Sequence, residues 1–241
     1  MKLNKPSFNI ILPLISLVAI LSSFQVEAQL SNGVYMAEQK GQRHELKIKD
    51  NYIVHSIYDQ SPAKFIKTKG GYFTHENDEL TVKLEFDSDF DSNKSKEWSV
   101  PVLITDDQLT MNTDPALTFT KTKNLEQDLD GQWLFATRGP DDGQERRGDD
   151  NPRKTLKFLI DGRFQWIAYN TETFKFHGTG GGSFTSSDGI YTEQIEYFSK
   201  DNSRVGATLQ FKYEIKGNDW HHTGKNSKGE PMYEIWSTRG V

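Results

Sequence analysis

Two ionisable residues in the second half of the chain stand where a β-protein would bury them. Glu193 and His222 lie in segments that alternate between apolar and polar residues, and in such strands every second side chain faces the same side. A buried carboxylate needs a charged or hydrogen-bonding partner, and a buried imidazole can accept a proton. The pair could therefore hold a polar group of a small molecule or act as a general acid or base.

An internal repeat is the reason for placing both side chains inside. The segments 64–74 and 175–185 align without a gap, Lys64 with Lys175 and Thr74 with Thr185, and are identical at seven of eleven positions. A duplicated domain is the simplest cause of this match. Positions where the copies agree then report the fold, and positions where they differ report what each copy does.

One strand of the first copy fixes which positions face inward. Its apolar residues, which must be inside, are Leu80, Val82, Leu84 and Phe86. When the alignment of the repeat is extended to this strand, the inward set of the second copy becomes Tyr191, Glu193, Ile195 and Tyr197. A carboxylate thus takes the place of Val82, and Glu193 is predicted to point into the second domain.

The same comparison makes the second copy the more polar and aromatic one. Its predicted ligand-binding residues are Trp166, Tyr191, Glu193, Tyr197, Tyr213, Trp220 and His222. Aromatic faces around a few polar groups are typical of small-molecule sites. The alternative is a closed polar core in which these groups satisfy one another and no ligand binds.

The elements that must position these residues are strands. Alternation continues nearly everywhere after Leu30, and no segment keeps a helical period for three turns. Each copy contains eight short strands, which predicts an all-β fold of two tandem eight-stranded antiparallel up-and-down barrels, because closure removes edge strands. Gly181 and Gly182 interrupt one strand and predict a bulge or bend with a structural role.

The ends of the second copy carry a family resemblance. Gly131-Gln132-Trp133 opens its first strand, the glycine run lies in its middle, and Arg239 follows its last strand. These features resemble the lipocalin-like (calycin) barrels, in particular small secreted bacterial proteins of that kind. The resemblance implies that Trp133 packs under Arg239 in a cation–π contact that closes the barrel. The first copy has Tyr35 in place of the tryptophan, so its membership depends on the repeat.

The chain divides into a leader and two domains. Lys2 and Lys5 precede an apolar run that ends in a small-residue cleavage pattern, which predicts a signal peptide over 1–28, cleaved after Ala28. We then expect a degenerate first barrel over 29–123, a linker over 124–128 and a second barrel over 129–241. The expected location is the periplasm or the cell exterior. The chain has no cysteine, so neither a lipoprotein anchor nor a disulfide is expected.

The net charge and the motifs argue against several classes of partner and cofactor. The formal net charge is −5 and no basic run is present, which argues against nucleic acid or membrane insertion after signal removal. His221 and His222 are adjacent and so face opposite sides of a strand, which argues against a shared metal ion. No signature of a nucleophilic triad, zinc protease or phosphate loop occurs, so no cofactor and no catalytic residue is assigned.

One insertion distinguishes the second copy. The loop after its first strand is longer than in the first copy and contains the acidic and basic run 140–152. Its carboxylates lack the spacing of a calcium loop, so we expect a solvated flexible loop or a lid over the barrel mouth.

The sequence therefore predicts an exported barrel protein whose second domain binds a small, partly apolar molecule. One alternative is an enzyme that uses Glu193 or His222 as general acid or base, and another is an envelope interaction module without a ligand. On the sequence alone, Glu193→Val restores the residue of the first copy and is expected to leave the fold intact.

Overall fold

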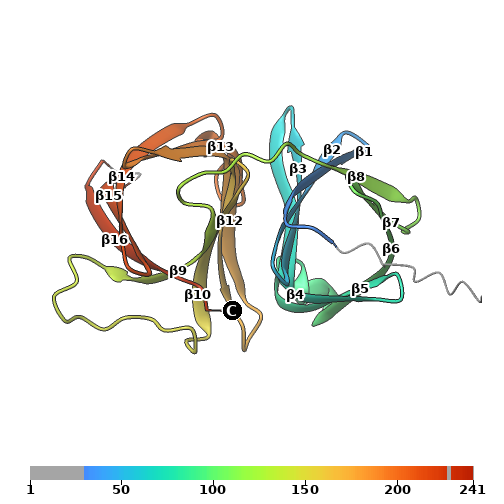
Figure 1. The fold of residues 1–241 in the computed structure, drawn as a ribbon, viewed down its shortest axis with the longest axis horizontal. Helices are drawn as coiled ribbons and strands as arrows, with labels where there is room; N and C mark the ends of the chain where they lie inside the picture. Colours follow the sequence, from blue (N-terminus) through green and yellow to red (C-terminus); the bar gives the residue numbers. More distant parts are fainter. Residues whose placement is uncertain (1–29, 227–228, 241) are drawn as a thin grey trace, which may run out of the picture.

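The computed structural model describes residues 30–226 and 229–240, and the predicted signal peptide lies outside them. Two closed eight-stranded antiparallel barrels follow each other along the chain (Figure 1), which confirms the predicted fold class and the duplication. Neighbouring strands in each barrel are consecutive in sequence, as in an up-and-down barrel. This architecture fits a lipocalin-like fold.

The first barrel contains β1 to β8, with β1 paired to β8. Its strands are β1 (Gly33–Gln39), β2 (Gln42–Lys49), β3 (Tyr52–Gln60), β4 (Ala63–Glu76), β5 (Glu79–Asp87), β6 (Glu97–Ile104), β7 (Gln108–Met111) and β8 (Leu117–Lys121). One short helix, α1 (Phe90–Asn93), lies between β5 and β6. In the part of the chain that the structure describes, no helix has the length and apolar character needed to cross a membrane.

The second barrel repeats this order and closes through a pair between β16 and β9. Its strands are β9 (Gly131–Arg138), β10 (Arg153–Ile160), β11 (Arg163–Asn170), β12 (Phe176–Ser187), β13 (Ile190–Phe198), β14 (Thr208–Lys216), β15 (Asp219–Lys225) and β16 (Pro231–Thr238). A 3₁₀ turn, η1 (Asn202–Arg204), precedes β14.

The glycine pair of the repeat marks a β-bulge in both barrels. In the second barrel Gly181 pairs with Tyr197 and Gly182 with Ile195, so Glu196 is an extra residue on β13. A Cβ atom on Gly182 would collide with the carbonyl oxygen of Gln194, which is why a side chain is excluded there. The first barrel has the same shift between Gly70 and Gly71. The bulge predicted from the glycines is therefore present.

The bulge reverses the alternation of side chains beyond it, and this corrects the prediction for Tyr197. Ile195 before the bulge packs in the core of the second barrel. Tyr197 lies on the outside, where its ring packs 4.4 Å from Tyr58 and 6.3 Å from Phe65 of the first barrel. The sequence placed Tyr197 inside because strict alternation was extended through the strand. Phe86 is displaced in the same way and packs outside against Tyr169.

The two barrels pack against each other through the outer faces of their neighbouring strands, as Figure 1 shows. A buried apolar cluster joins them, and its largest members include Tyr52, Phe86, Phe158 and Tyr169. Beside it, the Ser56 hydroxyl donates to Gln165 Oε1 over 2.9 Å, and Gln165 Nε2 donates to Thr68 and Thr179 over 3.1 Å each. The barrels are thus closely packed neighbours.

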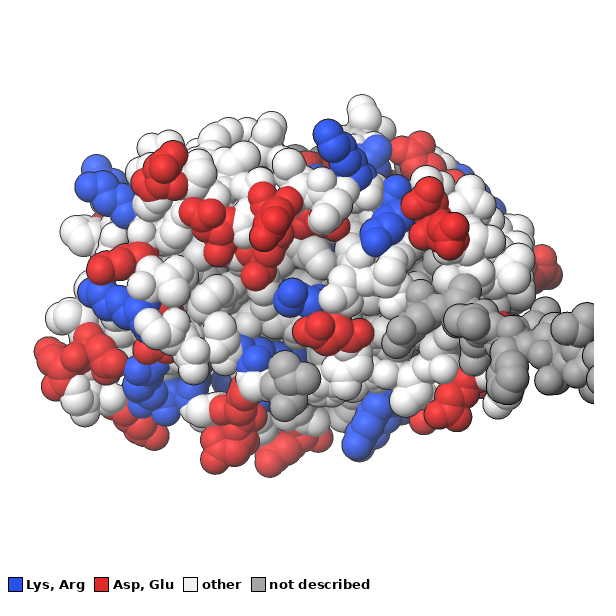
Figure 2. Space-filling view, in the orientation of Figure 1, with Lys and Arg blue, Asp and Glu red and all other residues white. Residues whose placement is uncertain are grey.

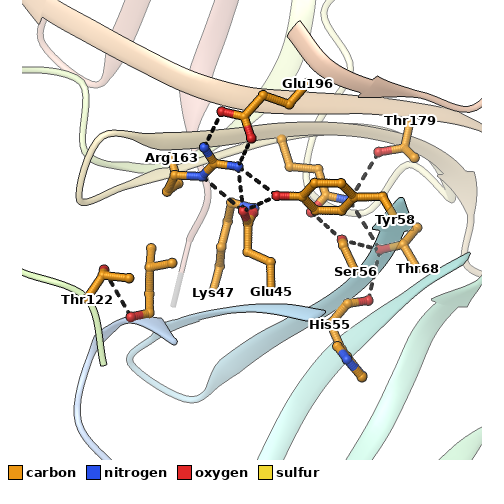
Figure 3. Close-up of polar contacts among 12 residues, drawn as sticks. Glu45, Lys47, His55, Ser56, Tyr58, Thr68, Thr122, Arg163, Thr179 and Glu196 are labelled. Atoms are coloured by element: carbon orange, nitrogen blue, oxygen red, sulfur yellow. Dashed lines mark hydrogen bonds and ion pairs between the residues drawn. The ribbon is translucent and has the colours of Figure 1, made fainter. Parts of the chain in front are cut away.

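An ion-pair network crosses the same interface (Figure 3). Arg163 of the second barrel donates to Glu45 of the first through Nε at 2.9 Å and Nη2 at 2.7 Å. It also holds Glu196 of its own barrel at 2.5 and 2.8 Å. Lys47 forms a second ion pair with Glu45, and Tyr58 donates to the same carboxylate. Glu45 and Lys47 are fully buried, so the interface encloses charges that these partners neutralise.

The expected contact between Trp133 and Arg239 is not the one formed. The Arg239 guanidinium lies 4.4 Å from the ring of Tyr52 and 4.9 Å from that of Tyr72, and donates to Glu85 over 2.6 Å. All three partners belong to the first barrel, and a charge-assisted hydrogen bond to a partly buried carboxylate is stronger than a contact with an aromatic face. Trp133 is buried instead beside Trp220, and its Nε1 donates to the Leu129 carbonyl over 2.9 Å.

Candidate functional site

Glu193 points into the second barrel, and its partner there is a lysine from β10. Lys157 Nζ lies 2.9 Å from Glu193 Oε1, and the Tyr191 hydroxyl donates to the same oxygen over 2.7 Å. The ammonium group is also 4.8 Å from the ring centre of Trp220 and 5.2 Å from that of Trp236. All of these side chains are buried. The carboxylate is therefore neutralised inside the barrel by a cation held among aromatic rings.

His222 and Glu234 extend this polar level toward one end of the barrel. His222 Nδ1 lies 3.8 Å from Glu234 Oε2, too far for a hydrogen bond, and the Trp236 indole donates to the same oxygen over 3.2 Å. Among the described residues, neither ring nitrogen of His222 has a hydrogen-bond partner. Burial, and then the charge of Lys157, lowers the pKa of His222 to about 4. The imidazole is therefore neutral at pH 7.

Glu234 keeps its negative charge at neutral pH for opposing reasons. Burial alone raises the pKa of its carboxyl group, but contact with His222 and the positive charge of Lys157 outweigh that effect, so the pKa lies below its ordinary value. The level formed by these side chains contains one lysine, two carboxylates and one neutral imidazole. Burial of charges costs free energy that their pairing offsets only in part. A core of this kind is therefore poorly explained by stability alone.

The first barrel contains an apolar residue at each of these four positions. The alignment of the repeat relates three of the pairs, and strand register relates Glu234 to Leu117, because His222 pairs with Glu234 as Met111 pairs with Leu117. The four buried residues of the first barrel are Leu46, Val82, Met111 and Leu117. The ionisable groups at these four positions are therefore a feature of the second barrel.

The low pKa of His222 makes a testable prediction about stability against pH. An unfolded histidine titrates near 6.5 and the native one near 4, so the stability that a neutral His222 provides is complete above pH 6.5 and lost as the pH falls toward 4. We expect His222→Met, which introduces the residue of the first barrel, to remove roughly 3 kcal/mol of this loss. Urea unfolding of both proteins at pH 7.5 and 4.5 measures it. Equal losses on acidification would contradict a neutral native imidazole.

The remaining predicted residues that face the interior are cross-strand neighbours of the polar level. Trp166 faces inward opposite Lys157 and packs edge-on against Phe198 at 5.4 Å. Tyr213 is the cross-strand partner of His222, and its hydroxyl donates to Asp128 of the linker. The structure therefore brings together Tyr191, Glu193, Trp220 and His222, with Trp166 and Tyr213 directly beside this level on neighbouring strands. His221 faces outward and bonds the Tyr233 hydroxyl, as alternation predicted.

Sequence reasoning missed three members of the polar level. Lys157 could have been found by the comparison that found Glu193, because Leu46 is its aligned counterpart in an alternating strand of the first copy. Glu234 and Trp236 could not, because the last strands of the two copies do not keep the same separation. The positions of Glu234 and Trp236 depend on how β16 pairs with β15, where Trp236 lies opposite Trp220.

An opening in the barrel wall leads to this level. In the first barrel β1 and β2 pair along their whole length, from Gly33 with Ile48 to Gln39 with Gln42. In the second, β9 and β10 pair only as far as Leu134 with Leu156, and beyond that point the strands part. The inserted loop over 139–152 connects their separated ends.

We call the cavity between these ends the β9–β10 pocket. It has a volume of about 630 Å³. Its lining residues are Phe135, Ala136, Thr137, Arg138, Glu145, Arg146, Arg147, Asn151, Arg153, Thr155, Glu234 and Trp236. None of the seven residues predicted from the sequence lines it. Glu234 and Trp236 belong to both the pocket and the polar level, so they connect the surface opening with His222 and Lys157.

The inserted loop is one wall of the pocket. The Arg147 amide donates to the Ala136 carbonyl over 2.8 Å, and the Arg146 guanidinium binds Asp219 and Ser237 on the barrel wall. These contacts anchor the loop across the ends of β9 and β10. Of the two expectations, the lid describes its position better than a free solvated loop does.

Two histidines form a polar pair inside the first barrel. His44 Nδ1 lies 3.2 Å from His55 Nε2, and the His55 ring stacks on Trp98 at 5.8 Å. Burial lowers the pKa of both imidazoles. Phe174, from a loop of the second barrel, packs on Phe90 of α1 at 4.6 Å and joins the core of the first barrel. One aromatic side chain of the second barrel thus completes the core of the first.

Within the described ranges, no cluster of three or more histidine and acidic side chains has the geometry to hold a metal ion. Inside the second barrel, Lys157 and Glu193 neutralise each other. Comparison of the chain with models of known protein families and with curated proteins finds no match to either.

Proposed function

We propose that this protein is an exported lipocalin-like protein whose second barrel binds a small, partly apolar molecule in the β9–β10 pocket. One observation carries the proposal. The wall of the second barrel opens onto the interior level where four apolar residues of its duplicate are replaced by ionisable ones. Divergence of both features in the same copy, at the same place, favours selection for a ligand over selection for stability.

The lining of the pocket supports a ligand of mixed character. Phe135 and Trp236 pack edge to face at 5.5 Å and form an apolar floor. Glu234 and Thr155 add oxygen atoms that can accept hydrogen bonds beside that floor. The volume of about 630 Å³ lies in the range of small-molecule sites. An apolar body of the ligand would lie on the rings, and its polar groups would face the rim.

Export is part of the same proposal. The lysines and the apolar run at the start of the sequence support a signal peptide over 1–28, and a ligand-binding barrel would then act in the periplasm or outside the cell. Mass measurement of the protein recovered from its source cells tests this. Loss of the segment from Met1 to Ala28 is expected, and an intact Met1 would contradict export with cleavage.

Blocking the pocket tests the binding function. Thr155 lines the pocket, so Thr155→Trp should fill the cavity without breaking a strand pair. Thr185→Trp, on the exposed side of β12, is the matched control. We expect the neutral fluorescent probe N-phenyl-1-naphthylamine to bind the wild type and the control equally, and the blocked variant at least tenfold more weakly. Native mass spectrometry of the protein from its source should also show a carried molecule that the blocked variant lacks.

Two outcomes would contradict the proposal. Equal probe binding by the blocked variant would place the ligand elsewhere. Absence of both a carried molecule and probe binding in the wild type would leave the interaction module without a ligand as the better description. Turnover that is lost in His222→Met while probe binding is kept would instead favour the enzyme alternative.

A further inference from the structure

The lining of the β9–β10 pocket contains a much higher proportion of arginine than this acidic chain as a whole. Among the described residues that line it, Arg138, Arg146, Arg147 and Arg153 stand with two carboxylates, those of Glu145 and Glu234. The whole protein has a formal net charge of −5, and Figure 2 shows acidic and basic side chains interspersed over the visible face. A positive cavity within such a surface focuses the field on anions that approach it.

Most of these cations have no partner that neutralises them. Arg146 is held by Asp219 at 2.8 Å and by Asp141 at 2.9 Å. Arg138, Arg147 and Arg153, by contrast, form no ion pair with any side chain of the described residues. Elsewhere in the molecule the arginines at positions 43, 163, 204 and 239 each lie beside a carboxylate. The unpaired arginines are therefore concentrated at the pocket.

Strand geometry directs two of the unpaired guanidinium groups toward the cavity. Arg138 is the cross-strand neighbour of Glu234, which lines the pocket from β16. Arg153 lies two residues before Thr155 and four before Lys157, so it faces the same side of β10 as both. The third, Arg147, lies over the floor, with its guanidinium 5.1 Å from the centre of the Phe135 ring. Charge is thus placed around an aromatic floor.

We propose that the ligand of this pocket is an organic anion, a carboxylate, sulfonate or phosphate ester with an aromatic or apolar body. The inference rests on the proposed function and specifies its ligand class. Guanidinium groups bind oxyanions through two parallel hydrogen bonds, so Arg138 and Arg153 would hold the anionic group at the rim. The body would lie on Phe135 and Trp236. In the described part of the first barrel the β1–β2 hairpin is closed by pairing, so this site has no counterpart there.

A pair of probes that differ only in charge tests the ligand class. 8-Anilinonaphthalene-1-sulfonate has the same ring system as N-phenyl-1-naphthylamine plus a sulfonate group. We expect the sulfonate probe to bind the wild type at least about tenfold more tightly than the neutral probe, since charge-assisted hydrogen bonds are the difference. Arg138→Gln and Arg153→Gln should each remove about tenfold of the sulfonate affinity and leave the neutral probe unchanged. Added salt should weaken only the sulfonate probe.

Arg43→Gln is the matched control, because Arg43 lies in the first barrel in an exposed pair with Glu38. It should change neither affinity. Equal binding of the two probes, with no effect of the pocket arginines, would overturn the anion inference and leave the proposed function standing. If neither probe binds in a manner that Thr155→Trp prevents, the proposed function itself fails. Thermal unfolding of each variant shows whether a lost affinity reflects a lost fold.

Discussion

Glu193→Val is expected to destabilise the protein by about 3–5 kcal/mol, because it leaves the Lys157 ammonium buried with no opposite charge. This reverses the expectation from the sequence, in which restoring the valine of the first copy was neutral. The difference is Lys157, which faces Glu193 across the barrel interior at 2.9 Å. Removal of one partner of a buried ion pair costs far more than removal of both.

The matched variant removes both charges of this ion pair and the hydroxyl that binds them. Lys157→Leu and Glu193→Val together recreate Leu46 and Val82 of the first barrel, and Tyr191→Phe removes the hydroxyl that donates to Glu193. We expect the free energy of unfolding of this triple variant to lie within about 1 kcal/mol of the wild-type value, since well-packed apolar residues replace buried ion pairs at little cost. Urea unfolding at pH 7.5 measures both proteins. A cost below about 1 kcal/mol for Glu193→Val alone would show that Lys157 reaches water without its partner.

Glu45→Gln, at the interface between the barrels, is expected to lower the free energy of unfolding by about 3–5 kcal/mol. The substitution keeps the shape of the side chain but leaves Lys47, which is fully buried, without a counter-ion. Glu38→Gln is the control, because Glu38 forms an exposed pair with Arg43 in the same barrel, and such pairs contribute about 1 kcal/mol or less. Denaturant unfolding of both variants separates a buried network from a surface pair. Equal, small losses would contradict an enclosed interface.

The same carboxylate predicts how the interface responds to acid. Burial raises the pKa of Glu45, but the charges of Arg163 and Lys47 outweigh it and lower the pKa to about 2. The pKa of the folded form lies below the unfolded value near 4.5, so the stabilisation is present above pH 4.5 and lost as the pH falls toward 2. Wild-type protein should lose stability in that interval, and Glu45→Gln should lose less. Parallel curves for the two proteins would show that the carboxylate is not charged in the native interface.

Specific residues show which features of the structure could be predicted from the sequence. The repeat and the alternation predicted two eight-stranded barrels, and they placed Glu193, Trp220 and His222 inside the second one. They also identified the glycine pair as a bulge. The inside–outside pattern reverses beyond that bulge, and the prediction did not include this reversal. Tyr197 was therefore placed inside. A bulge adds one residue to one strand, and its exact position depends on the partner strand, which the local pattern does not contain.

The sequence by itself determined which side of a strand a residue takes wherever no bulge intervenes, because alternation is a local property of the backbone. Only the tertiary structure decided which residues meet across the barrel or between barrels. Lys157 with Glu193, Arg163 with Glu45 and Arg239 with Glu85 join residues 36 to 154 positions apart. The β9–β10 pocket depends on where two strands stop pairing. Such contacts follow from strand register and from the docking of one barrel on the other, and neither leaves a periodic signal in the chain.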